Sequence, residues 1–159
     1  MALRRFIGNI PPMIHSLLYV STQAFTPADA DATIARIVTG SRRRNVRFGV
    51  TGALIATARR FAQVIEGPSD SIATLFASIR FDPSHRDVTV LLADTISERR
   101  FGEWSLAYHG LAPYLEHVVA PMVASRTVTE RDGHRLISVM RYLAAEPIWA
   151  STVHTTAES

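Results

Sequence analysis

Gln63 is the first of three polar residues whose surroundings suggest chemistry. It lies in the apolar segment 61–66, and the two-residue period of a strand puts its carboxamide on the same side as Phe61 and Ile65. A carboxamide buried among apolar neighbours costs about 1–3 kcal/mol if its donors and acceptor stay unpaired. Either this face is exposed, as on an edge strand, or another group meets the amide.

Tyr19 and Asn45 are the other two candidates. Tyr19 lies inside the apolar run 15–21, and a buried tyrosine hydroxyl usually finds a hydrogen-bond partner, most often in the backbone. Asn45 follows the first predicted helix, and the simpler interpretation is that it caps the helix in the left-handed backbone conformation. An asparagine amide also offers a donor and an acceptor side by side, so it can pair with the imide edge of a heterocycle.

The hydrophobic pattern predicts the elements that position these residues. A short buried strand at 15–21 is followed by a helix with Thr26 as N-cap, Pro27 at its first position and Gly40 as its stop. A hairpin of strands at 50–57 and 60–66 comes next, then a helix from Ser69 that Asp82 and Pro83 end. The run 88–93 is typical of a strand covered on both faces, and 101–109 alternates as a last strand with Trp104, Leu106 and Tyr108 on one side.

This order predicts an α+β fold, a ferredoxin-like βαββαββ sheet with two helices on one face, plus C-terminal helices. The pattern predicts a short helix at 114–120, closed by Pro121, and a clearer one at 129–145 that Thr129 and Asp132 begin. We expect a leader at 1–13, a main domain at 14–110, a helical output or cap at 111–150 and a frayed tail at 151–159. The C-terminal helix either covers the open face of the sheet or binds a partner, through the stripe Leu136, Val139, Met140 and Leu143.

Composition narrows the function classes. The 159-residue chain is 47% hydrophobic and 19% charged, which is a globular composition. It has no cysteine, which excludes a disulfide framework, a thiolate metal site and a thiol nucleophile, and fits a reducing, cytoplasmic location. All its strongly basic residues are arginine, with one dense run at 42–44, but a net charge of +3 does not by itself indicate nucleic acid. No apolar stretch is long enough to span a bilayer.

Five blocks of the sequence resemble, in order, those of the BLUF photoreceptor family. They are LLYVS around Tyr19, Asn45 followed by GVTGALI (49–55), FAQVIEGP (61–68), IRFDPSH (79–85) and RRFGEW (99–104). The resemblance runs from Leu17 to Tyr108. No single block is decisive, but five of them in this order are specific.

The resemblance implies a blue-light sensor that holds a flavin, FAD or alternatively FMN, between the two helices on the sheet. It implies that Asn45 bonds the polar edge of the ring and that Gln63 lies between Tyr19 and the flavin N5 and C4 oxygen. Light would drive electron and proton transfer from Tyr19, rearrange the Gln63 hydrogen bond and shift the flavin absorption to the red. The other expected cofactor contacts are Ile37, Ser41, Arg44, Phe61, Ser78, Ile79, Asp82, His85 and Leu106, and Trp104 is expected near the switch as a packing residue that can swing toward the pocket.

Two positions depart from the family pattern. Arg44 stands where relatives often carry asparagine or histidine. Leu106 stands where they carry methionine, so this chain lacks the sulfur through which some relatives are proposed to pass the signal from the last strand to the tail. As in short relatives, we expect no catalytic centre, self-association into a homo-oligomer, and a separate effector protein as partner, with neither nucleic acid nor membrane.

Three other classes of protein share single features with this sequence. An RNA-binding module of the RRM type shares the ferredoxin-like order, but segment 61–66 lacks its aromatic, basic signature. A small ferredoxin-like hydrolase needs a phosphate-binding loop near a catalytic arginine and asparagine. Asn45 and the arginine run at 42–44 supply the residue types but not such a loop. A flavoenzyme without light sensing would need a nicotinamide site or a substrate base, and neither is evident. Colour separates flavin proteins from the first two classes, because flavin proteins purify yellow and the other two purify colourless.

Overall fold

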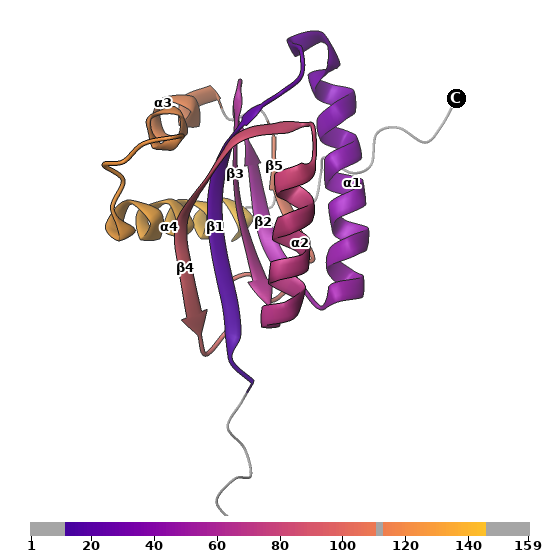
Figure 1. Ribbon diagram of the computed structural model, residues 1–159, viewed down its shortest axis with the longest axis vertical. Coiled ribbons are helices and arrows are strands. Elements are labelled where there is room, and N and C mark those ends of the chain that lie inside the picture. Colours follow the sequence, from indigo (N-terminus) through magenta and orange to yellow (C-terminus); the bar gives the residue numbers. More distant parts are fainter. Residues whose placement is uncertain (1–11, 111–112, 146–159) are drawn as a thin grey trace, which may run out of the picture.

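The computed structural model describes residues 12–110 and 113–145 (Figure 1). A five-stranded sheet in the order β4-β1-β3-β2-β5 is antiparallel except for β5, which runs parallel to β2. This confirms the predicted α+β class and the order of the elements. The elements are β1 (Ile14–Gln23), α1 (Ala30–Phe48), β2 (Thr51–Ala56), β3 (Arg60–Gly67), α2 (Ser69–Phe81), β4 (His85–Ile96), β5 (Ala107–His109), α3 (Glu116–Val119) and α4 (Glu130–Ala145), with 3₁₀ turns at Pro27–Asp29, Pro113–Leu115 and Ala120–Met122.

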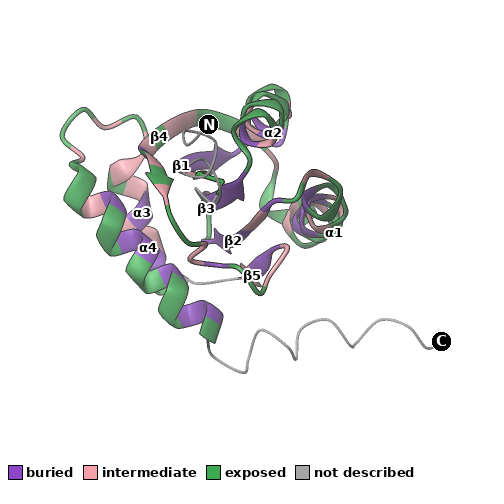
Figure 2. Cartoon of the chain, turned by 90° about the horizontal axis from the view of Figure 1, so that it is seen from below, coloured by how far each residue is buried: buried purple, intermediate pink, exposed green. Residues whose placement is uncertain are grey.

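Helices cover both faces of the sheet. Figure 2 shows α1 and α2 on one side and α3 and α4 on the other. Two apolar clusters lie under α1 and α2, and a larger one lies under α3 and α4. Because side chains alternate along a strand, Tyr19 and Gln63 face the α1–α2 side while their neighbours Leu18 and Val64 face α4.

Helix α1 is longer than predicted. Thr26 and Pro27 begin the 3₁₀ turn before α1, and Asp29 stands at the N-cap position of the helix itself. Gly40 does not end the helix. The helix ends at Gly49, whose φ of 64° is the left-handed conformation that glycine adopts without strain. A glycine inside a helix costs about 1 kcal/mol relative to alanine, and the buried side of α1 outweighs that cost because it continues on both sides of Gly40, through Ile34, Ile37, Val38, Ser41 and Asn45.

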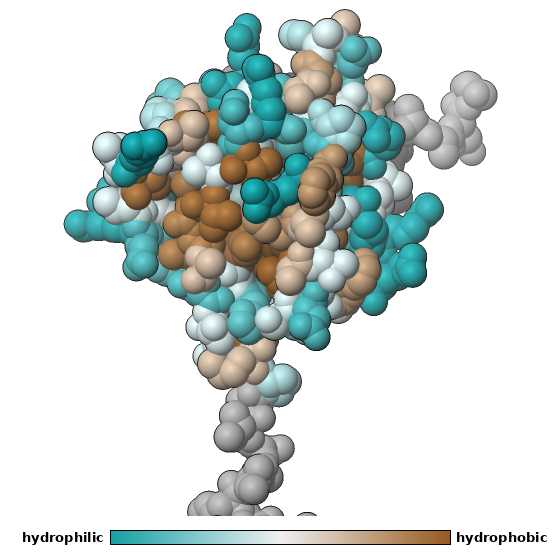
Figure 3. Space-filling model, in the orientation of Figure 1, coloured by the Kyte–Doolittle hydropathy of each residue, from teal (hydrophilic) through white to brown (hydrophobic). Residues whose placement is uncertain are grey.

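Strand β4 departs from its prediction as well. It spans twelve residues rather than six, and of them only Leu92 is buried. The expectation of a strand covered on both faces was wrong because β4 is a sheet edge. Figure 3 shows apolar surface where β1 and β4 run beside α2. On β4, Val90 is 44% exposed.

The last predicted strand is mostly a connecting segment. Only Ala107–His109 pair with β2, and residues before them form a turn. At the start of the segment, the fully buried side chain of Glu66 accepts the backbone N–H groups of Arg100 (2.9 Å) and Phe101 (3.0 Å), so these two amides are not available to a ladder. The 99–106 segment is also held by Arg99, which donates to the carbonyl oxygens of Glu66 and Gly49.

The C-terminal helices pack on the sheet. The helix predicted at 129–145 is confirmed, and its start is capped by Thr129 and Asp132, which exchange backbone and side-chain hydrogen bonds. Of the predicted stripe, Val139 is instead 37% exposed, and Ile137 is buried in its place. The short helix predicted at 114–120 is present as α3, with a 3₁₀ turn at each end, and Pro121 lies within the second of these turns. The predicted covering of the open sheet face is therefore confirmed.

Several expectations fall outside the described residues. These are most of the 1–13 leader, the end of the 111–150 segment and the 151–159 tail. Within 12–110 and 113–145, no helix has the length and apolarity needed to cross a bilayer, and no group of three metal-binding side chains comes together.

Candidate functional site

Tyr19 and Gln63 are hydrogen-bonded to each other at the centre of the sheet. The two residues lie directly opposite in the β1–β3 ladder, and the Tyr19 hydroxyl donates to Gln63 Oε1. Tyr19 is completely buried and Gln63 is 4% exposed. Burial, together with the Asp82 carboxylate, raises the pKa of Tyr19 well above its ordinary value, against the opposing effect of Arg44. The phenol is therefore held in its protonated, donating form.

The Gln63 amide is used on one side only. Its oxygen accepts from Tyr19, and none of the hydrogen bonds found between described residues engages its nitrogen. A primary amide carries two N–H donors, so the Gln63 side chain presents unused donors on the α1–α2 side of the sheet. A turn of the amide would exchange the oxygen that Tyr19 now contacts for those donors.

Asn45 lies inside α1, not beyond its end, so the cap interpretation was wrong. Its side chain is 1% exposed, and Nδ2 donates to the Ser105 carbonyl oxygen at 2.6 Å. Its Oδ1 atom is enclosed and has no partner among the described residues. A buried unpaired acceptor is costly, and an imide N–H of a heterocycle is a group that would satisfy it. The site therefore fits a flavin ring on this observation.

Apolar residues of both helices and the sheet surround the pair. Ile37 on α1 and Ile79 on α2 are each 8% exposed, and both face the sheet. Phe61 and Leu106 belong to the same cluster as Ile37. Ser41 lies on the same buried side of α1 as Ile37 and Asn45.

The end of α2 and the start of β4 bring a carboxylate and a histidine to the site. The His85 ring lies 4.9 Å from that of Phe61 and meets Tyr19 edge-on, and its Nδ1 is hydrogen-bonded to Ser21 Oγ at 2.9 Å. Burial lowers the pKa of His85, although the Asp82 carboxylate opposes this. For Asp82, burial disfavours the charge, but hydrogen bonds from Ser84 outweigh it and lower the pKa of the carboxyl. Asp82 is thus ionised and His85 neutral at pH 7.

This predicts a specific acid sensitivity. The folded-state pKa of His85 lies below its ordinary 6.5, so the unfolded chain takes up the proton first as the pH falls. The stability contributed by neutral His85 is complete above about pH 6.5 and is lost as the pH drops through the folded-state value. Urea unfolding of the flavin-free protein between pH 7.5 and 5 will show a smaller loss of stability for His85→Gln than for wild type. The control is His117→Gln, at an exposed position of α3, and equal pH slopes for wild type and His85→Gln would contradict the argument.

Three predicted contacts lie away from this cluster. Ser78 is exposed on α2, and Arg44 is exposed, with a guanidinium nitrogen 3.5 Å from Ser41 Oγ. Trp104 does not share a side with Leu106 as its alternation predicted. It packs instead with the cluster under α4, because the strand that would have aligned the two residues begins only at Ala107.

Three residues of the site escaped sequence reasoning. Ser21 holds His85, Arg36 reaches Ser84 Oγ from α1 at 3.4 Å, and Ser105 supplies the carbonyl that Asn45 contacts. Ser21 could have been found, because it shares the strand face of Tyr19. The other two contacts join distant segments and leave no local signal.

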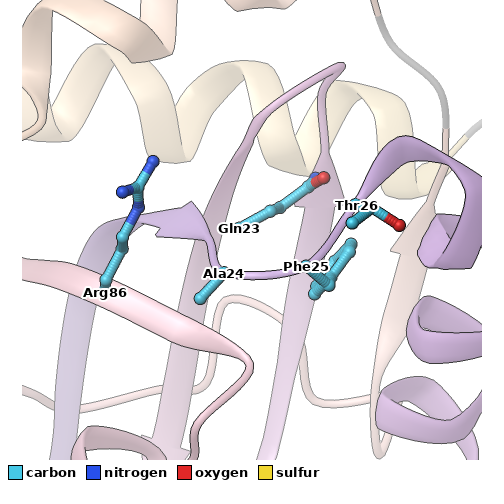
Figure 4. Close-up of a pocket in the computed structure, with 5 residues that line it drawn as sticks. All are labelled: Gln23, Ala24, Phe25, Thr26 and Arg86. Carbon is cyan, nitrogen blue, oxygen red and sulfur yellow. The ribbon is translucent and has the colours of Figure 1, made fainter.

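A surface hollow of about 370 Å³ lies at the end of β1, outside this cluster. Figure 4 shows Gln23 and Arg86 on two sides of it, with the loop residues Ala24, Phe25 and Thr26 completing the wall. None of the expected cofactor contacts lines it.

Comparison with known proteins assigns the family. The family model described as sensors of blue-light using FAD matches residues 14–107, which include the whole Tyr19–Gln63 cluster. The chain belongs to the BLUF family. The described sheet, the two helices over Tyr19 and Gln63, and the enclosed Asn45 acceptor are thus those of a family of flavin-using blue-light sensors.

Curated BLUF relatives are much longer proteins. This chain is 32% identical over 136 residues to the photoactivated adenylate cyclase subunit beta of Euglena longa, a match that covers 82% of this chain and 15% of that protein. It is 36% identical over 70 residues to the blue light- and temperature-regulated antirepressor BluF of Escherichia coli (strain K12), covering 44% of this chain and 17% of the relative.

Solved BLUF structures share the fold. The dark-state structure of the BLUF protein BlrB superposes with a TM-score of 0.69 at 29% identity, covering 84% of this chain and 99% of BlrB. The ground state of BlsA gives a TM-score of 0.69 at 22% identity, which supports the fold alone.

Proposed function

We propose that this BLUF domain is a photosensor in which Tyr19 and Gln63 are the switch. The observation that carries the proposal is the buried phenol donating to a buried carboxamide whose own donors are unused. Such a pair has two stable arrangements, because the amide can present either its oxygen or its nitrogen to the phenol.

The flavin would be held between α1 and α2 by the residues gathered there. Asn45 offers its enclosed oxygen to the imide edge, and Ile37 and Ile79 supply apolar walls. FAD is the expected form, from the family description, and FMN is the alternative. Phe61, Ser41, Asp82, His85 and Leu106 complete the set, while Arg44 and Ser78 would reach the cofactor only from the solvent side.

The chemistry of the switch follows from the acidity of an oxidised phenol. A bound flavin supplies a strong oxidant when it absorbs blue light. Tyr19 gives the electron, and its oxidised phenol is far more acidic than the resting group, whose pKa is about 10. The proton leaves along the existing hydrogen bond to Gln63 Oε1. Once the electron and the proton had returned to Tyr19, Gln63 would remain turned or tautomerised, and its side chain would then be a donor toward the bound flavin.

A light-minus-dark absorption spectrum tests the proposal. We expect the purified protein to be yellow and its flavin band to shift to the red under blue light. Gln63→Leu, which keeps the volume of the side chain but removes its amide, should bind flavin and show no shift. A normal shift in that variant would refute the switch, and a colourless protein that takes up no flavin would refute the sensor.

The output is proposed to leave through the C-terminal helices to a separate effector protein, without catalysis by this chain. The exposed side of α4 supports a partner surface, because Arg131, Arg135 and Arg141 accompany the exposed Val139 and Tyr142. Among the described residues, no ion pair neutralises these arginines. Self-association and a cytoplasmic location stay expectations of this proposal.

The RNA-binding alternative loses its support at Phe61. An RRM stacks bases on exposed aromatic residues of its central strands. Phe61 is fully buried and packs against Phe25 and His85, so it offers no face to a base.

A further inference from the structure

The tip of the β2–β3 hairpin is joined to the C-terminal segment by one carboxylate. Glu116, the first residue of α3, accepts hydrogen bonds at Oε2 from the Thr57 hydroxyl and from the Arg59 backbone N–H, the latter at 3.2 Å. Thr57 is 1% exposed, so its bond to Glu116 is partly shielded from water, while the bond from Arg59 lies at the surface. The remaining described attachment of α3 is apolar, through the buried side chains of Leu115 and Val119.

The same hairpin tip is gripped from the other side by Gln23. Its amide nitrogen donates to the carbonyl oxygens of Thr57 (3.0 Å) and Arg60 (3.1 Å), and its backbone N–H donates to that of Arg59 (2.8 Å). Gln23 also forms a wall of the open hollow at the end of β1 (Figure 4). The tip is therefore clamped between the end of β1 and the start of α3.

Both strands of the proposed switch run to this clamp. Gln23 ends β1, the strand that carries Tyr19, and Arg60 begins β3, the strand that carries Gln63. A change in the Tyr19–Gln63 bond alters how β1 and β3 sit against each other, and packed strands transmit such a shift rather than absorb it. The tip is where that shift would meet a group of the C-terminal segment.

We propose that Glu116 is a latch. In the dark its hydrogen bonds to Thr57 and Arg59 hold α3 on the hairpin tip, and rearrangement of Gln63 in the light changes the strength of these hydrogen bonds. The dark part of this proposal stands on the contacts alone. The light part rests on the proposed photosensor function. Glu116 acts here as a positioning residue for the output segment and takes no part in binding the flavin.

Hydrogen exchange of the full-length, flavin-loaded protein tests the latch, because the Arg59 amide is itself a donor to Glu116. In the dark, Glu116→Ala should exchange that amide at least tenfold faster than wild type, with Glu116→Gln in between because its carbonyl can still accept. Glu130→Ala is the matched control, since Glu130 opens α4 but is exposed. Unchanged Arg59 exchange in Glu116→Ala would overturn the latch.

The light part is read on residues 113–122. In wild type, blue light should change their exchange, and Glu116→Ala should lose this change while it keeps the red shift of the flavin. If the variant keeps the light-dependent exchange, or if wild type shows the spectral shift without it, the coupling is refuted. If wild type shows no spectral shift, the photosensor proposal fails instead, and the dark exchange of Arg59 still decides the latch.

Discussion

Tyr19→Phe will abolish the light-induced red shift of the bound flavin and leave the flavin bound. The variant removes one oxygen atom, the donor to Gln63 Oε1, and keeps the ring that packs against Phe76 and His85. A phenylalanine has no hydroxyl proton to transfer, so nothing drives rotation or tautomerisation of the Gln63 amide. The readout is the light-minus-dark spectrum at matched flavin content.

The control for this variant is Tyr108→Phe. Tyr108 packs partly buried on the same side of the sheet, beside the cluster of Ile37 and Phe61. It makes no described contact with Gln63, so its variant should keep the full shift. Loss of a buried hydrogen bond should cost Tyr19→Phe about 1 kcal/mol of stability, which urea unfolding can separate from a loss of fold. A red shift of normal size in Tyr19→Phe would exclude Tyr19 as the donor.

Gly52→Ala will destabilise the protein by about 3 kcal/mol, near the upper end of typical over-packing costs. A Cβ on Gly52 would lie 2.0 Å from the carbonyl oxygen of Val64 and 3.1 Å from its carbon. These are backbone atoms of the neighbouring strand, whose spacing the ladder fixes. The strands must separate locally, beneath the site.

Gly40→Ala supplies the matched comparison. The same added methyl meets nothing within 4 Å at Gly40, and it replaces glycine inside a continuous helix. It should therefore stabilise the flavin-free protein by about 0.5–1 kcal/mol. Urea unfolding of both variants checks the pair, and equal stabilities would show that the close approach at Gly52 does not exist.

The two halves of the switch were predicted from sequence to different degrees. Strand periodicity put Gln63 with Phe61 on one face, and Tyr19 with Leu17 on one face. It could not show that the two residues stand opposite each other, because a slip of two residues keeps every face and changes every pair. The family resemblance implied the pairing, and Tyr19 does lie opposite Gln63 in the register of β1 against β3.

Local signals failed where packing between distant segments decides. Gly40 is a reasonable helix end by propensity, yet burial of the residues on either side carries α1 past it. Trp104 was aligned with Leu106 by alternation, but the buried Glu66 carboxylate holds the preceding amides outside the sheet. The acceptors of Asn45 and Arg36 likewise lie on segments about fifty residues or more away.

The way α1 and β2 hold the connecting segment has an evolutionary consequence. Asn45 donates to the carbonyl of Ser105, Arg42 to that of Leu106, and the Gly52 amide to that of Trp104. All three acceptors are main-chain oxygens, which every amino acid carries. Substitutions at 104–106 can therefore change the side chains that this segment presents to an output element while its attachment to α1 and β2 is kept. Leucine at position 106 is one substitution that such an attachment tolerates.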